Sequence, residues 1–127
     1  MRLAGSILVG LVALFHLWFL VLEMFLFTRP TGLETFHLSQ QTANACATLA
    51  QNQGLYNGFV AVALLLGLWN KSLLLRRYGL GCVMVAGVFG AWSLGDPGPL
   101  VGQLVPGLVA LLVSELGERG ASADGAR

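Results

Sequence analysis

Residues 3–27 form an almost uninterrupted apolar run, long enough to cross a bilayer, for which about 20 apolar residues suffice. Two ionisable side chains, His16 and Glu23, interrupt this run. They lie seven positions apart, two helical turns, so a helix places them on one face. Ionisable groups at membrane depth are costly and usually have a function or a partner. What these two side chains face therefore constrains what the chain can do.

The composition indicates a membrane protein. Of the 127 residues, 56% are hydrophobic and only 10% are charged, whereas soluble domains have roughly 25% charged residues. The formal net charge of +1 gives no argument for a nucleic-acid partner. Cys46 and Cys82 have no metal-binding spacing, and we expect neither a metal nor a cofactor. A cleaved signal peptide fits poorly, because its apolar region would have about 7–15 residues.

Hydropathy and turn residues predict four membrane spans within one domain, residues 1–116. The predicted spans cover residues 4–27, 43–69, 75–94 and 99–116. Residues 117–127, rich in Gly, Ala, Ser and charged side chains, are predicted to form a disordered cytoplasmic tail. The expected fold is all-α, a four-helix transmembrane bundle.

Basic residues concentrate on one side of the predicted spans. That side carries Arg2, Lys71, Arg76, Arg77, Arg119 and Arg127. Only Arg29 lies on the opposite side. Because cytoplasmic loops carry an excess of Lys and Arg, we expect the N- and C-termini to be cytoplasmic. The expected location is the bacterial inner (plasma) membrane, as a multi-pass protein.

The second predicted span carries the four polar side chains Asn52, Gln53, Tyr56 and Asn57 near its middle. A helix rises about 1.5 Å per residue, which places Glu23 about 28 Å from the cytoplasmic start of the first span and His16 near its middle. Antiparallel packing would bring the four side chains level with these two. Ser93 and Gln103, from the outer ends of the third and fourth spans, would complete the upper layer. We therefore predict a polar pocket open toward the outer leaflet.

These polar residues also have a purely structural interpretation. Asn, Gln and His often join transmembrane helices through hydrogen bonds worth about 0.6–2 kcal/mol each. For His16, a hydrogen-bonded neutral imidazole fits better than a metal ligand, because no second ligand has a suitable spacing. Glu23 is harder to explain by packing alone. A carboxyl buried without a partner keeps its proton, and this is the form that a general acid or a proton carrier uses.

Two stretches, VLEMFLF at residues 21–27 and NQGLYNG at residues 52–58, resemble a family of small bacterial integral membrane proteins called domain of unknown function 1304. His16, Met24, Pro30, Phe36 and the glycines of the third span also fit this family. The resemblance covers about residues 7–112 and leaves out the tail. It implies a four-helix bundle and brings no established chemistry.

The sequence leaves three functions open. The first is cofactor-free acid/base chemistry, an isomerisation or an epoxide opening, on a hydrophobic lipid-like substrate, with Glu23 and His16 as catalytic residues. Six side chains would bind the substrate or a water: Asn52, Gln53, Tyr56, Asn57, Ser93 and Gln103. The second is a small proton-coupled exporter of the multidrug type, and the third is a structural or accessory membrane subunit. The expected partners are membrane lipid and a hydrophobic small molecule, with a homo-oligomer left open.

Overall fold

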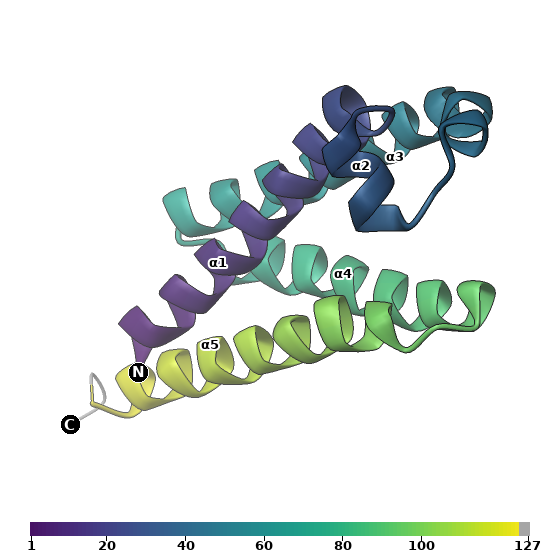
Figure 1. Ribbon diagram of the computed structural model, residues 1–127. Coiled ribbons are helices and arrows are strands. Elements are labelled where there is room, and N and C mark those ends of the chain that lie inside the picture. Colours follow the sequence, from purple (N-terminus) through teal and green to yellow (C-terminus); the bar gives the residue numbers. More distant parts are fainter. Residues whose placement is uncertain (125–127) are drawn as a thin grey trace.

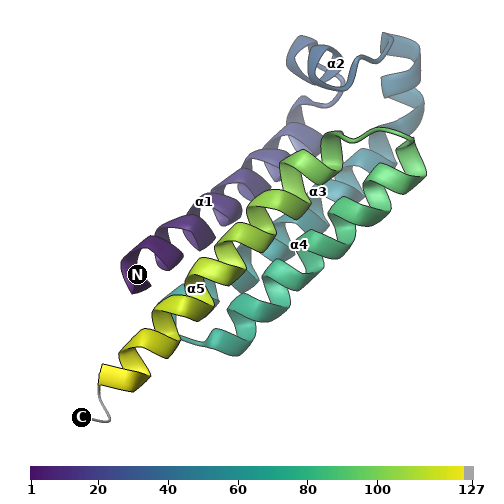
Figure 2. The ribbon, with the colours of Figure 1, turned by 90° about the horizontal axis from the view of Figure 1, so that it is seen from below.

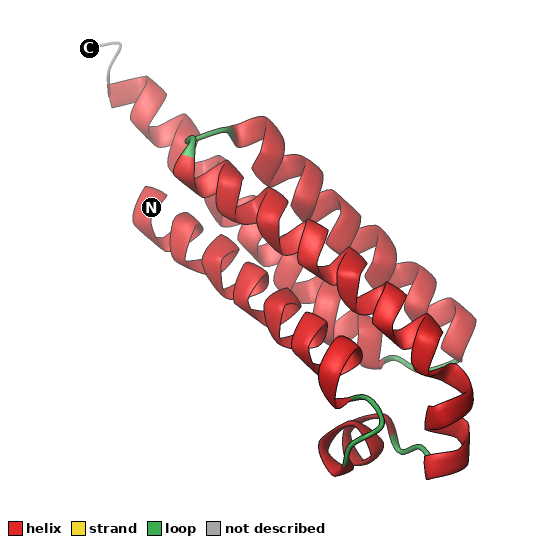
Figure 3. Ribbon diagram, turned by 90° about the horizontal axis from the view of Figure 1, so that it is seen from above, coloured by secondary structure: helices red, strands yellow, loops and turns green. Residues whose placement is uncertain are grey.

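The computed structural model describes residues 1–124, with side chains as far as Gly120, and every secondary-structure element in this part of the chain is a helix. Figure 1 shows the elements in chain order: α1 (Arg2–Val21), the π-helical turn η1 (Leu22–Leu26), α2 (Pro30–Phe36), α3 (Gln40–Trp69), α4 (Leu73–Leu94), the π-helical turn η2 (Leu100–Leu104) and α5 (Val105–Asp124). The four long helices pack in a ring, in which α1 contacts α3 and α5, and α4 contacts the same two helices (Figure 2). The short α2 lies across one end of the bundle (Figure 3).

Three segments are long and apolar enough to cross a membrane: Arg2–Leu26, Leu73–Leu94 and Leu100–Gly120. The prediction of an all-helical fold is therefore confirmed over the described residues, with three candidate membrane spans. At 30 residues α3 is the longest helix, but it is not among these candidates. Its polar first half lowers its hydropathy, so its crossing stays a prediction.

Local sequence determines where the long helices begin and end. The hydroxyl oxygens of Ser39 and Ser72 accept the backbone N–H groups of Thr42 (3.2 Å) and Leu75 (3.3 Å), which caps the starts of α3 and α4. Gly95 ends α4 in the left-handed conformation, with φ +65°, which glycine adopts without steric cost. The turn from α3 to α4 therefore covers only residues 70–72, and the turn from α4 to η2 only residues 95–99.

The helices approach one another closely where glycines face a neighbour. A Cβ on Gly5 of α1 would lie 2.7 Å from the Cα of Ser114 in α5, and a Cβ on Gly58 of α3 would lie 2.5 Å from Cδ1 of Leu20. Small residues allow such contacts between transmembrane helices. Between these contacts lies the apolar core, which is centred on Val9, Ala13, Leu64, Leu80 and Val83.

The last helix differs from the expected tail. The sequence predicted disorder over residues 117–127, but α5 continues to Asp124, and residues 125–127 lie outside the described part of the chain. A Cβ on Gly117 would lie 2.8 Å from the backbone nitrogen of Arg2, and Glu118 forms an ion pair with Arg2. These contacts with the start of α1 hold the final turns of α5, and composition alone does not reveal them.

A buried arginine joins three helices at this end of the bundle. Arg76 of α4 is only 5% exposed, and its Nη1 donates to Oγ of Ser114 (3.2 Å). Its Nη2 donates to Oε1 of Glu118 (3.1 Å), while Oε2 of Glu118 pairs with Nη2 of Arg2 (3.2 Å). Glu118 therefore links α5 to both α4 and α1.

Replacing Glu118 by alanine should destabilise the bundle, because it leaves the buried Arg76 guanidinium without its carboxylate. Breaking a fully buried pair costs about 3–5 kcal/mol. The Glu118 side chain is 30% exposed, so we expect a smaller loss, about 1–3 kcal/mol, measured as a lower Tm of the purified protein in nanodiscs. Glu115→Ala is the matched control. It removes a two-bond contact to the exposed Arg77 (2.5 and 2.7 Å) from the same helix, and an equal loss of Tm in both variants would contradict the assignment.

Candidate functional site

Glu23 and Asn57 form a hydrogen-bonded pair between η1 and α3. Nδ2 of Asn57 donates to Oε2 of Glu23 at 2.7 Å, and both residues are half-buried. The same nitrogen donates to the backbone carbonyl of Gln53 (3.3 Å), which orients the amide. A Cβ on Gly54 would lie 3.1 Å from Cβ of Glu23, so the absence of a side chain at Gly54 lets α3 come close enough for the bond.

Five other side chains predicted for this site make no hydrogen bond to Glu23 in the part of the chain that the structure describes: Asn52, Gln53, Tyr56, Ser93 and Gln103. The three from α3 are exposed on its surface. Oγ of Ser93 donates instead to the carbonyl of Gly90 in its own helix (3.2 Å). Gln103 lies against α4, because a Cβ on Gly87 of α4 would be 3.1 Å from the Cβ of Gln103. Of the predicted set, the structure joins Glu23 only to Asn57.

His16 has different neighbours from Glu23. It is 4% exposed, and its Nδ1 lies 2.9 Å from the backbone carbonyl oxygen of Val12. A carbonyl oxygen only accepts, so Nδ1 carries the proton and Nε2 of the neutral ring is a hydrogen-bond acceptor. Among the described residues, Nε2 of His16 has no hydrogen-bond partner. In this part of the chain, Nε of Arg76 is the one side-chain nitrogen or oxygen that is both fully buried and without a hydrogen-bond partner, so Nε2 of His16 is not fully buried. It follows that Nε2 is open to the space beside it.

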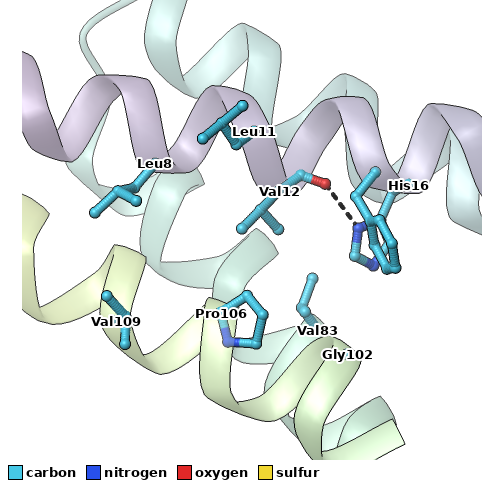
Figure 4. Close-up of a pocket in the computed structure, with 9 residues that line it drawn as sticks. Leu8, Leu11, Val12, His16, Val83, Gly102, Pro106 and Val109 are labelled. Atoms are coloured by element: carbon cyan, nitrogen blue, oxygen red, sulfur yellow. Dashed lines mark hydrogen bonds between the residues drawn. The ribbon is translucent and has the colours of Figure 1, made fainter. Parts of the chain in front are cut away.

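His16 lines an apolar pocket of about 350 Å³ between α1, α4 and the η2–α5 segment (Figure 4). Its lining consists of Leu8, Leu11, Val12, Phe15, His16, Val83, Gly102, Pro106 and Val109. His16 supplies the single polar side chain of this set and lies at one end of it, with Leu8 and Val109 at the other. Leu11 and Val109 are 56% and 44% exposed, so the pocket opens on the outer surface of the bundle.

This pocket was not predicted from the sequence, because His16 was expected to face the second span. Val83, Gly102 and Pro106 come from the third and fourth predicted spans. The sequence offers one signal for them, the helix-disturbing Pro106 in an otherwise apolar segment. Within the described residues, no group of three or more His, Cys, Asp or Glu side chains is placed to hold a metal ion.

Comparison with known proteins finds one family. A family model described as "Protein of unknown function (DUF1304)" matches residues 10–114. The matched range contains His16, Glu23 and Asn57, together with every residue lining the pocket except Leu8. No curated protein and no solved structure matches the chain.

The Glu23–Asn57 bond should contribute measurably to stability. We expect Asn57→Ala to lower the free energy of unfolding by about 0.6–1.7 kcal/mol, the range for hydrogen bonds between transmembrane helices. Asn52→Ala, which removes an exposed amide from the same helix, should leave the Tm nearly unchanged. Thermal unfolding of both variants in nanodiscs measures the difference. The bond would be energetically unimportant if both variants unfolded like the unmodified protein.

Proposed function

Because the chain belongs to the DUF1304 family, whose members are proteins of unknown function, we propose its function from its own geometry: it is an integral membrane protein whose His16 pocket binds a hydrophobic, lipid-like small molecule. One observation carries the proposal, an apolar pocket of about 350 Å³ with a buried imidazole as its single polar side chain. Small-molecule sites typically have volumes of about 300–1,000 Å³ and combine an apolar lining with a few placed polar groups.

In this proposal all four long helices cross the bacterial inner membrane. α3 runs alongside α1, with Gly58 against Leu20 and Leu68 against Gly10, so its second half lies beside the apolar α1. The exposed large side chains of this half are apolar or aromatic: Phe59, Val62, Leu65, Leu66 and Trp69. They suit contact with lipid, while the polar first half of α3 lies toward the α2 end, where the bilayer surface would be.

The charge distribution supports an orientation with both termini in the cytoplasm. The N-terminus, the α3–α4 turn and the end of α5 lie at one end of the bundle (Figure 2). That end carries Arg2, Lys71, Arg76, Arg77 and Arg119. Arg29 lies beside α2, at the other end. The excess of Lys and Arg marks the cytoplasmic end.

Any acid/base chemistry in this pocket would use His16 alone, because Glu23 lies elsewhere. Glu23 does not line the pocket among the described residues, and it bonds to Asn57 of α3 instead. A single base can remove and return a proton, as in an isomerisation, whereas epoxide opening also uses an acid at the leaving oxygen. Isomerisation is therefore the reaction class that this pocket supports better, and we assign Glu23 and Asn57 to joining α1 and α3.

Cysteine labelling tests the proposed crossing of α3 in the full chain. In a background with Cys46 and Cys82 replaced by serine, His37→Cys lies before α3 and Lys71→Cys lies after it. A membrane-impermeant maleimide added to intact cells should label the first variant but not the second, and both should react after permeabilisation. Labelling of both positions in intact cells would mean that α3 does not cross the membrane. Labelling of Lys71→Cys alone would mean that α3 crosses in the opposite orientation.

Filling the pocket should prevent ligand binding. Gly102 lines the pocket and a Cβ there meets nothing within 4 Å, so Gly102→Leu adds a side chain without a backbone clash. We expect it to reduce labelling of the pocket by a diazirine-bearing decyl methyl ether about fivefold or more in nanodiscs, read by peptide mass spectrometry. Gly81→Leu is the matched control, because a Cβ at Gly81 is equally unhindered and lies outside the pocket lining. Equal labelling of the pocket in both variants would overturn the proposal.

A further inference from the structure

We propose that the molecule bound in the His16 pocket is a lipophilic alcohol, phenol or enol whose hydroxyl group donates a hydrogen bond to Nε2 of His16. This inference rests on the proposed function and names the chemical class of its ligand. In the bound state the hydroxyl lies at the His16 end of the pocket, and the apolar part extends toward Leu8 and Val109 (Figure 4).

The hydrogen bond to Val12 determines which partner His16 can take. Because Nδ1 donates to that carbonyl (2.9 Å), the neutral ring presents an acceptor, and not a donor, to the pocket. Phe15 packs against the imidazole with its ring edge-on, the centroids 6.2 Å apart and the planes at 73°. Since both the bond and the ring contact come from α1 itself, the orientation of Nε2 is set before any ligand enters. A ligand must therefore bring the donor.

The rest of the lining restricts that donor to a small neutral group. No charged side chain lines the pocket within the described residues, so an ammonium or a carboxylate would lose its hydration without a counter-charge. A primary amide or a sugar would bring several polar atoms to a surface that offers one side-chain acceptor, and the remaining polar atoms would stay unpaired. A hydroxyl group brings a single hydrogen-bond donor, its O–H, and Nε2 of His16 accepts a single hydrogen bond.

The volume limits the size of the molecule. If each non-hydrogen atom occupies about as much space as a water in the liquid, about 30 Å³, a pocket of about 350 Å³ accommodates about 12 such atoms. A larger amphiphile also fits if its tail leaves through the opening beside Leu11 and Val109 into the lipid. The ligand class is therefore a single-headed molecule, with one hydroxyl group and an otherwise apolar body.

Competition between two matched probes tests the inference on the full-length protein in nanodiscs. 4-Pentylphenol carries the hydroxyl, and 4-pentylanisole has the same body with the donor replaced by a methyl ether. Each compound competes with the diazirine-bearing decyl methyl ether for labelling of the pocket, and concentrations are expressed as mole fractions in the lipid. We expect the phenol to compete about 2–10-fold more effectively, the factor for one net hydrogen bond. His16→Phe, which keeps a planar ring, should lower this ratio to about one, and His16→Gln, which restores an acceptor, should retain part of it.

Each result separates the inference from the proposed function. If both probes compete equally in the unmodified protein, the hydroxyl class is wrong and the hydrophobic pocket stands. If neither probe competes, both the pocket and the ligand class are overturned. A preference for the phenol that persists in His16→Phe would mean that the hydroxyl bonds elsewhere, which also overturns the inference. Should His16→Phe fail to fold, the ratio in the unmodified protein and in His16→Gln decides between the same outcomes.

Discussion

The helices of this bundle approach one another closely at glycine positions, and polar contacts between helices lie beside some of these positions. In a bilayer, helices gain little by burying hydrocarbon from one another, because lipid is equally apolar, and they associate through van der Waals contact and a few polar bonds. Gly5 brings α5 against α1 near Ser114, which is a partner of Arg76. Gly54 brings α3 against η1, within reach of the Glu23 carboxylate. Two of the interhelical polar contacts, Arg76–Ser114 and Glu23–Asn57, thus lie beside a glycine at which two helices approach closely.

Polar residues divide the bundle into two ends with different chemistry. At the end where α1 begins and α5 ends, the buried Arg76 and the shared carboxylate of Glu118 join α1, α4 and α5. At the α2 end, Glu23 and Asn57 join η1 and α3. The α1 wall of the His16 pocket runs between these two polar regions, and His16 is the single polar side chain in the lining of the pocket.

The sequence predicts the helices well and their neighbours poorly. Hydropathy identifies the apolar helices, and Ser39 and Gly95 mark helix ends by general capping rules. Local patterns do not show that Arg76 turns inward, because burial depends on Glu118, 42 positions later in the chain. The predicted shared face of His16 and Glu23 assumes a regular α-helix, but the π-helical turn Leu22–Leu26 widens the turn that carries Glu23. Glu23 then meets α3, while His16 lines a pocket with α4 and α5.

In the proposed function, the opening of the His16 pocket on the outer surface of the bundle also controls how its ligand enters. A molecule that reaches the site sideways from the hydrocarbon never crosses an aqueous phase, so the relevant concentration is its local abundance among the acyl chains. Occupancy then follows the partition coefficient of the molecule and the lipid-to-protein ratio. A poorly water-soluble compound can saturate such a site even when its level in the surrounding medium is negligible.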